Sequence, residues 1–246
     1  MFDLYGYQDI FLKGAWLTLQ VALLSLILAV ALGLLAALAK LSHSKILTSI
    51  ATIYTTVIRG IPDLILMLII FFGGQVLINN MSYGFNEWIN EVLTGYYPNH
   101  EWTSYLPDYI DISPYLAGII TIGFIFGAYM AETFRGAILS VSKGQLEAAT
   151  AYGMNKYKRF FRIMFPQMMR HALPGLGNNW LVLLKTTALV SIIGLQDMVK
   201  IAGDASGSTQ KPFTFYLVVA LVFLFYTSVS TAFLKWAEHK YSIRTR

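Results

Sequence analysis

The sequence of 246 residues contains no cysteine, so the chain can form neither a disulfide bond nor a thiolate metal site. Charged residues are scarce as well, at 13% of the chain, against about a quarter of an average soluble domain. The four histidines lie far apart, without metal-ligand spacing, at His43, His100, His171 and His239. The sequence therefore offers no basis for a disulfide-stapled secreted domain or for a metal centre.

Common enzyme motifs are also missing. The sequence has no GxxxxGK[ST] loop for a nucleotide, no GxSxG and no HExxH. We therefore expect no cofactor on this chain, and if ATP drives the protein, another polypeptide binds it. An enzyme that works within the membrane is disfavoured, because no nucleophile–base pair or metal set is evident.

Long apolar runs are what the chain does have. Hydrophobic residues make up 56% of the sequence, and the 26 residues from 14 to 39 carry no charge. A run of that length is enough for a tilted transmembrane helix. No basic region precedes it, so we expect no cleavable signal peptide. We predict an all-α membrane protein with a single transmembrane domain over residues 1–246 and five spans, at about 14–39, 61–79, 114–134, 172–195 and 212–234.

The basic residues predict how these spans are oriented. Of the 18 lysines and arginines, 14 lie between the first two spans, between the third and fourth, or after the fifth. The connection over residues 80–114 has five acidic residues and no Lys or Arg. Because cytoplasmic loops carry an excess of Lys and Arg, we expect the N-terminus outside and the C-terminus inside. Topology then explains the net charge of +5, and no nucleic acid is needed.

We expect residues 80–114 to form a long, polar connection outside the membrane. Two interpretations of its aromatic residues stay open. They form either an interfacial belt or a landing surface for an extracytoplasmic binding protein. These residues are Tyr83, Trp88, Tyr96, Tyr97, Trp102, Tyr105 and Tyr109.

The third predicted span carries a stripe of small residues. Gly123, Gly127 and Ala131 recur every four residues, so they share one face of a helix. Such faces let another helix approach closely, and we predict close packing there.

Two acidic residues lie near the ends of predicted spans. Asp63 follows Arg59 by four residues, and Glu132 precedes Arg135 by three. Each can pair with its arginine at the inner face of the membrane. Ionisable groups at membrane depth are costly and often line a substrate pathway. A structural ion pair and a pathway role therefore both remain open for Asp63 and Glu132.

Lys185 lies deeper, about ten residues from either end of the fourth predicted span, and is followed by Thr186 and Thr187. It is too deep to reach the membrane surface easily. We favour a pathway or inter-helix role for Lys185, Thr186 and Thr187. The alternative is a lysine that pairs with a neighbouring helix for structural reasons alone.

The most basic part of the chain, residues 147–166, separates the third and fourth predicted spans. Its glycine allows a backbone corner with φ > 0, and Asn155 is a suitable cap for a following helix. We predict two short helices joined at that glycine. The positions that define the pattern are Glu147, Ala148, Ala149, Gly153, Ile163 and Pro166.

This pattern resembles the EAA loop of ABC-importer permease subunits, in which Glu-Ala-Ala, Gly, Ile and Pro recur at the same spacing. The segments Arg59–Asp63, Gly127–Gly136 and Asn178–Leu189 resemble the polar amino acid branch of that family. Within the branch, the chain is most similar to the Q-type subunits of histidine/lysine/arginine/ornithine importers and to arginine permeases. Only the connection over residues 80–114 departs from this resemblance, because it looks longer than the one that Q-type subunits usually carry.

The resemblance implies a subunit that forms the translocation pathway in a bacterial inner membrane. It implies a cytoplasmic coupling-helix loop at residues 147–166 that docks on an ATPase subunit, with ATP and Mg bound to that partner. The implied partners are a second permease subunit, two ATPase subunits and a periplasmic amino-acid-binding protein. The implied cargo is a cationic amino acid: histidine, arginine, lysine or ornithine.

A function of a different class is an ion-coupled secondary transporter or channel. Such proteins often show inverted repeats and helices broken at the membrane midplane. Neither feature is evident in the sequence. The basic loop at residues 147–166 would then also be unexplained.

Overall fold

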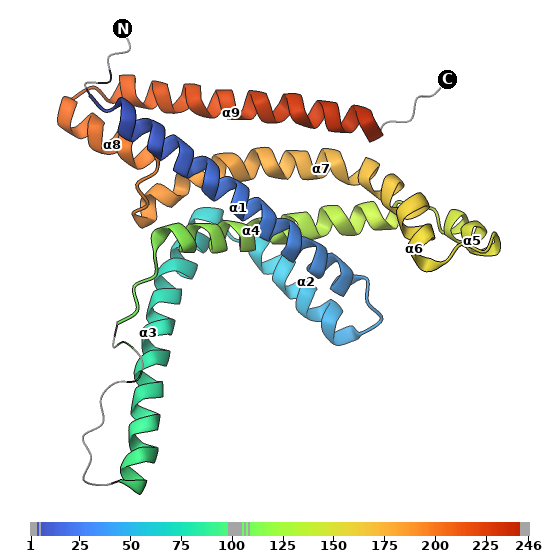
Figure 1. The fold of residues 1–246 in the computed structure, drawn as a ribbon, viewed down its shortest axis with the longest axis horizontal. Helices are drawn as coiled ribbons and strands as arrows, with labels where there is room; N and C mark the ends of the chain where they lie inside the picture. The colour runs from blue at the N-terminus through green and yellow to red at the C-terminus, as the bar shows by residue number, and fades with distance from the viewer. Residues whose placement is uncertain (1–3, 5, 98–104, 106, 108, 242–246) are drawn as a thin grey trace.

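The computed structural model describes every residue except 1–3, 5, 98–104, 106, 108 and 242–246, and for Tyr241 only the backbone. The described residues form helices, turns and extended segments, with no strand among them (Figure 1). In chain order the helical elements are α1 (Gln8–Lys40), α2 (Lys45–Gly60), α3 (Asp63–Tyr96), α4 (Pro114–Leu139), α5 (Lys143–Ala151), α6 (Lys156–Arg159), the π-helical turn η1 (Phe160–Met164), α7 (Phe165–Thr186), the 3₁₀ segment η2 (Thr187–Ile193), α8 (Met198–Thr209) and α9 (Pro212–Tyr241).

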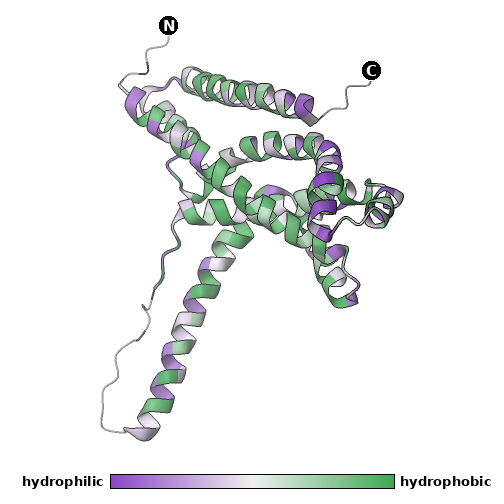
Figure 2. Cartoon of the chain, turned by 45° about the vertical axis from the view of Figure 1, so that its right-hand side comes forward, coloured by the Kyte–Doolittle hydropathy of each residue, from purple (hydrophilic) through white to green (hydrophobic). Residues whose placement is uncertain are grey.

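Five of the helical runs are long and apolar enough to cross a membrane: α1, α3, α4, the continuous run Lys156–Ile193, and α9. The prediction of five membrane-spanning helices is confirmed in this respect, and the chain is a multi-pass membrane protein. α4, α7 and α9 run side by side, and α1 crosses them diagonally (Figure 1). Apolar residues dominate these helices, whereas hydrophilic residues gather at the corner of α5 and α6 (Figure 2).

α1 and α4 form the centre of the molecule and approach closely through small residues. A Cβ atom added at Gly33 of α1 would lie 2.7 Å from Met130 Cβ, and one added at Gly123 of α4 would lie 2.6 Å from Leu28 Cδ2. Ala131 is fully buried. The predicted close packing of the small-residue stripe is therefore confirmed, and its neighbour is α1 of the same chain.

A substitution on this stripe should destabilise the subunit. A Cβ atom at Gly127 would lie 2.7 Å from Tyr54 Oη and 3.0 Å from Leu32 Cβ. Because overpacking a tight interface costs about 1–3 kcal/mol, we expect Gly127→Leu to lower the melting temperature of the detergent-purified protein. Gly136→Leu on the same helix is the control, since nothing lies within 4 Å of a Cβ there. Equal shifts in the two variants would contradict this packing.

The predicted polar connection over residues 80–114 begins as a helix, because α3 continues past the predicted end of the second span to Tyr96. The apolar run ends near Asn79, but a helix does not need apolar side chains outside lipid, and no proline occurs between Pro62 and Pro98. With 34 residues, α3 is about 50 Å long, which exceeds one crossing of a bilayer core. α3 leaves the other helices at a steep angle (Figure 1).

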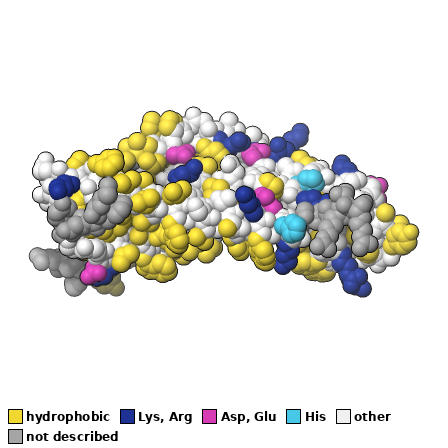
Figure 3. Space-filling model, turned by 90° about the horizontal axis from the view of Figure 1, so that it is seen from above, with side chains coloured by type: hydrophobic (Ala, Val, Ile, Leu, Met, Phe, Trp, Pro, Cys, Tyr) yellow, Lys and Arg dark blue, Asp and Glu magenta, His cyan; other side chains and the backbone are white. Residues whose placement is uncertain are grey.

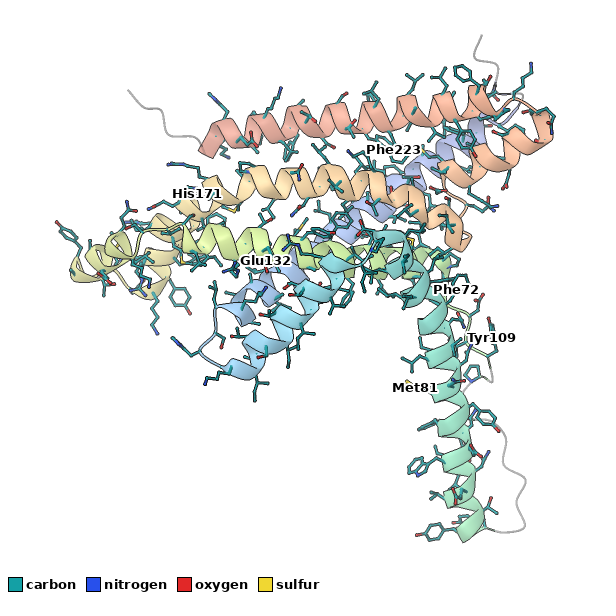
Figure 4. The ribbon with its side chains drawn as sticks, turned by 180° about the vertical axis from the view of Figure 1, so that it is seen from behind. Phe72, Met81, Tyr109, Glu132, His171 and Phe223 are labelled. Atoms are coloured by element: carbon teal, nitrogen blue, oxygen red, sulfur yellow. The ribbon has the colours of Figure 1, made fainter. Side chains whose placement is uncertain are left out.

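Polar side chains on one face of α3 hold the chain that returns from its far end toward α4. Figure 4 shows Tyr109 of this returning segment beside α3. The side chains are spaced three or four residues apart, so they share one face of the helix. We call them the α3 ladder: Gln75 accepts from the Ile112 N–H (2.9 Å) and donates to Ile110 O, Asn79 accepts from the Ile110 N–H (2.8 Å), Ser82 donates to Pro107 O (2.7 Å), and Asn86 accepts from the Tyr105 N–H (3.1 Å).

The aromatic residues predicted for this region lie on the solvent side of α3 and on the returning segment. Trp102 lies outside the described residues. The others are exposed: Tyr83, Trp88, Tyr96, Tyr97, Tyr105 and Tyr109. Large apolar side chains are exposed on most of the membrane-spanning helices as well, so an interfacial belt and a landing surface both remain open for these aromatic residues.

Candidate functional site

α5 ends at a sharp corner whose geometry depends on Gly153. This glycine has φ of +75°, which side chains with a branched Cβ avoid. The Met154 N–H donates to Ala149 O at 3.0 Å, and the Gly153 N–H donates to Thr150 O at 2.9 Å. This pair of bonds is a Schellman motif, which closes the carboxyl end of a helix. The predicted glycine corner between two short helices is therefore confirmed as geometry.

The second short helix begins at the corner and runs on into the fourth apolar helix. Asn155 Oδ1 accepts from the Lys158 N–H at 2.9 Å, so the predicted cap is confirmed. The wide turn η1 then leads to Pro166, which lies in the first turn of α7. Proline has no N–H to donate to the preceding turn, so the change from α-helical to π-helical hydrogen bonding in η1 costs little free energy. The run Lys156–Ile193 is thus one helix, longer than the predicted span at 172–195.

The pattern residues of the corner differ in exposure. Glu147 and Ala148 are exposed, Ile163 and Pro166 are half-buried, and Ala149 is buried at 4%. Only one of the two alanines is therefore available to a partner. The exposed aromatic side chains at the corner are Tyr152, Tyr157, Phe160 and Phe161.

Cations surround the corner. A hollow of about 390 Å³ between α5 and the α6–η1 run is lined in part by Lys143, Lys156 and Arg159. Arg159 Nη1 donates to Thr150 Oγ1 at 2.5 Å, which joins the two short helices. Most Lys and Arg visible in Figure 3 lie toward this end of the molecule. The corner thus presents a rigid, cationic surface with aromatic groups, suited to docking rather than to covalent chemistry.

Glu132 of α4 joins three helices. Its Oε2 accepts from Arg135 Nε at 3.0 Å, which confirms the predicted pair, and its Oε1 accepts from Lys40 Nζ of α1. Lys40 Nζ also donates to Thr55 Oγ1 of α2 at 2.7 Å. Figure 4 marks Glu132 on the side of α4 that faces α1 and α2. The sequence could not connect Lys40 with Glu132 or with Thr55, because no local spacing relates these residues.

Glu132 also borders a polar hollow of about 360 Å³, between α2 and α4. Arg59 and Tyr129 line the same hollow, and the Arg59 guanidinium carbon lies 5.5 Å from the centre of the Tyr129 ring. Lys185, Thr186 and Thr187 do not line it. The described chain therefore does not bring the predicted anionic and cationic pathway residues together.

Of the two roles left open for Asp63, the ion pair with Arg59 does not form. No ion pair joins them within the described residues, although Asp63 is half-buried at the start of α3. The reason is the break between the two helices: Ile61 is extended, with φ of −111° and ψ of 139°. A spacing of four residues brings side chains together only on a continuous helix.

Lys185 is exposed on α7, and its side chain has no hydrogen bond or ion pair with any residue that the structure describes. The two threonines beside it are occupied within their own helix. Thr186 Oγ1 donates to Val182 O at 3.1 Å, and Thr187 Oγ1 donates to Leu184 O at 2.7 Å. Thr187 is also buried, at 1% exposure. Of these three predicted residues, only Lys185 presents a free polar group.

Two residues that were not predicted to line the pathway share the exposed face of α7 with Lys185. Asn178 and His171 precede it by seven and fourteen residues and are both exposed. Residues seven apart lie on one side of a helix, and this spacing was available in the sequence. An unpaired polar face at membrane depth requires water, substrate or another protein chain opposite it.

Asp197 is an ionisable group outside the five apolar helices, and its side chain caps α8. Its Oδ1 accepts from the Lys200 N–H at 2.9 Å. Its Oδ2 has no partner among the described residues, and the residue is only 1% exposed. Burial raises the pKa of this carboxyl to about 6, because the charged form loses hydration.

The raised pKa predicts how stability depends on pH. The folded protein binds the proton more tightly than the unfolded chain, whose Asp pKa is about 4. The contribution of Asp197 is therefore fully present below pH 4 and is lost as pH rises through about 6. We expect Asp197→Asn to be more stable than the wild type at pH 7.5, by on the order of 3 kcal/mol, with a higher melting temperature, and to melt at a similar temperature at pH 3.

The exposed residue Asp204 supplies the control for this experiment. It pairs with Lys200 on the same helix, at 3.2 Å. Asp204→Asn should shift the melting temperature little at either pH, since exposed pairs contribute about 0–1 kcal/mol. A difference between Asp197→Asn and the wild type that stays constant with pH would contradict the assigned pKa.

No group of three or more His, Asp or Glu residues in the described part of the chain could hold a metal ion. The features that stand out are therefore the cationic corner, the Glu132 cluster and the polar face of α7. None of the three resembles a site for covalent catalysis.

Comparisons with known proteins converge on one family. Residues 29–243 match the family described as binding-protein-dependent transport system inner membrane component. The permease protein HisQ of the histidine/lysine/arginine/ornithine transport system of Salmonella typhimurium is 50% identical over 98% of this chain and 96% of its own length. The arginine ABC transporter permease ArtQ of Escherichia coli is 37% identical over 91% of each. A crystal structure of an amino acid ABC transporter with histidines matches 95% of both chains, with a TM-score of 0.74 and 29% identity.

Proposed function

The chain belongs to the family of binding-protein-dependent transport system inner membrane components, as a permease subunit of an ABC amino acid importer, and we propose that it carries cationic amino acids. The observation that supports this cargo is the 50% identity to a histidine/lysine/arginine/ornithine permease over 98% of the chain. Histidine, arginine, lysine and ornithine are the proposed substrates. A solved amino acid transporter with the same fold supports the same class of cargo.

The corner at residues 147–166 is the proposed coupling loop. Its exposed Glu147 and Ala148, its rigid glycine turn and its surrounding cations suit a docking surface for a separate ATPase subunit. ATP and Mg would bind to that partner. Closure of the ATPase pair on ATP would move the corner, and through the continuous helix Lys156–Ile193 that motion would reach the membrane.

The proposed orientation has the N-terminus outside and the C-terminus inside. This places the cationic corner in the cytoplasm, in keeping with the distribution of Lys and Arg. Reporter fusions at Asn99 and at the C-terminal tail should then report opposite sides of the membrane. A cytoplasmic signal from Asn99 would contradict the orientation.

The full transporter would sit in a bacterial inner membrane. The family implies a second permease subunit, ATPase subunits and a periplasmic binding protein. We propose one further permease chain, identical or paralogous, and two ATPase subunits. The exposed aromatic side chains of α3 and its returning segment are the proposed landing surface for the binding protein.

The polar face of α7 is the proposed lining of the pathway. Lys185 is the proposed group that receives the carboxylate of the amino acid. Thr186 and Thr187 would shape the helix beside it through their bonds to backbone oxygens. Asp63 and Glu132 remain candidates for the cationic end of the substrate, contributed from this chain or from the second permease.

Uptake by reconstituted vesicles tests the proposed function. Vesicles that contain the purified transporter and internal ATP should take up labelled arginine, in competition with lysine and histidine but not with glutamate. Uptake confined to neutral or acidic amino acids would refute the proposed cargo. Uptake without ATP, driven by an ion gradient, would instead support the ion-coupled transporter.

A further inference from the structure

The polar hollow beside Glu132 lies where the helical run of α2 and α3 is broken. α2 ends at Gly60, Ile61 is extended, and α3 begins at Asp63. α3 then leaves at a steep angle (Figure 1). The volume of the hollow, about 360 Å³, falls in the range of pockets that hold small ligands, about 300–1,000 Å³. The residues that line it are Thr55, Thr56, Arg59, Gly60, Tyr129 and Glu132.

The break lies at membrane depth. Tyr129 is near the middle of α4, which is long and apolar enough to cross a membrane. The Arg59 guanidinium lies over the ring of Tyr129, so the end of α2 is at the same depth. Irregular backbone at this depth is tolerated where it is buried in protein or faces a water-filled cavity. Gly60 is exposed, so the hollow requires polar contents.

The carboxyl end of α2 is uncapped. The last four carbonyl groups of a helix have no donor within the helix. In the described chain, no backbone N–H outside α2 donates to the carbonyl oxygens of residues 57–60. Pro62 cannot donate, because it has no N–H. These oxygens and the helix dipole give this end of α2 a partial negative charge, which favours a cationic group beside it.

Arg59 brings the opposite charge to the same hollow. Its side chain has no hydrogen bond or ion pair with a residue that the structure describes, and the Tyr129 ring holds it by a cation–π contact. The N–H groups of a guanidinium lie in its own plane, so a ring against its face leaves them available to a carboxylate. Glu132 does not compete, because its two oxygens already accept from Arg135 and Lys40.

We propose that this hollow binds the head group of an α-amino acid, with the carboxylate on Arg59 and the ammonium group on the carbonyl end of α2. The assignment rests on the proposed function as an amino acid importer. Every α-amino acid carries this head group, so the site does not choose among side chains. Lys185 does not line the hollow, so the carboxylate meets two separate cations along the pathway.

The test is whether binding depends on the carboxylate through Arg59. Calorimetry measures the binding of arginine and of agmatine, which is arginine without its carboxylate, to the purified transporter without ATP and without binding protein. We expect the wild type to prefer arginine by about ten- to a hundredfold, the range for a charge-assisted hydrogen bond. Arg59→Met should bind the two ligands with similar affinity, because the group that distinguishes them is gone.

Further variants keep the test specific. Arg59→Lys retains the charge and should retain part of the preference. Lys45→Met removes a cation from the other end of α2, outside the hollow, and should keep the full preference. If Arg59→Met fails to assemble, Gly60→Leu replaces it. A Cβ atom there meets nothing within 4 Å, so leucine can enter the hollow without a clash and should lower the affinity for arginine at least about tenfold.

Three results would overturn the assignment. The first is a wild-type preference for arginine in assembled Arg59→Met, or wild-type affinity in Gly60→Leu. The second is loss of the preference in Lys185→Met alone, which would give the carboxylate to Lys185. The third is a transporter that is active in ATP-driven uptake and binds no amino acid in this state. If uptake identifies a different amino acid as cargo, that amino acid and its decarboxylated amine replace arginine and agmatine, so a wrong cargo does not decide this test.

Discussion

Gly153→Val should reduce amino acid uptake by the reconstituted transporter at least about tenfold, while the chain still inserts in the membrane and assembles. Gly153 has φ of +75°, and holding a β-branched residue there costs on the order of 1–3 kcal/mol. The Schellman motif would open, and the Met154 N–H would lose Ala149 O as its acceptor. The substitution alters none of the five apolar helices. Uptake and ATP hydrolysis measured on the same vesicles would reveal uncoupling.

Two further variants make this test specific. Gly153→Asn should restore much of the uptake, because asparagine tolerates the left-handed conformation better than valine. Gly144→Val lies in the first turn of α5, just before the loop. Its Cβ would meet only Ser142 Oγ, at 3.8 Å, and the variant should leave uptake nearly unchanged. Wild-type uptake by Gly153→Val would remove the corner from its proposed coupling role.

Lys185→Met should lower uptake by about ten- to a hundredfold, the range expected when a charge-assisted hydrogen bond worth about 1.5–3 kcal/mol is lost. Lys185 is exposed, and within the described part of the chain it has no partner. Removing its charge therefore breaks no ion pair inside the subunit. Methionine keeps much of the side-chain length, so the variant should assemble with normal yield and a normal melting temperature.

Separate measurements of maximal uptake rate and half-saturating substrate concentration would locate the effect. Lys185→Arg retains the charge and should keep part of the activity. Lys200→Met removes a lysine that pairs with Asp204 in α8 and is the matched control. Normal uptake by Lys185→Met would place the lysine against lipid head groups or a structural partner. Loss of assembly would assign it to the interface with the second permease.

Glu132 illustrates what the sequence could and could not predict. Its pairing with Arg135 followed from a spacing of three residues and was correct. Lys40 lies 92 residues earlier in the chain, and only the tertiary packing of α1 on α4 brings it to Glu132. With two cations held by one carboxylate, neutralisation to Gln would unpair both. The structure thus strengthens the structural interpretation of Glu132 relative to the pathway role that the sequence also allowed.

Local signals with a defined geometry were the reliable ones. The glycine corner, the Asn155 cap and the small-residue stripe each depend on a few neighbouring residues, and all three were predicted correctly. The Asp63–Arg59 pair, one of two alternatives that the spacing allowed, does not form because the helix breaks between the two residues. The length of α3 was underestimated because hydropathy indicates which residues lie in lipid, and a helix can continue beyond them into water.

The α3 ladder has a mechanical consequence. The side chains of the ladder each bind a particular backbone group of the returning chain. Ser82 and Asn86 are buried there, so a shift of the returning chain by one residue along α3 would leave buried polar groups unpaired. The attached segment leads within a few residues to Pro114, where α4 begins. α4 in turn ends four residues before the start of α5, the helix that leads to the glycine corner. The polar end of α3 is therefore joined to the start of α4 by side-chain hydrogen bonds as well as through the chain, so a displacement of α3 would act on α4.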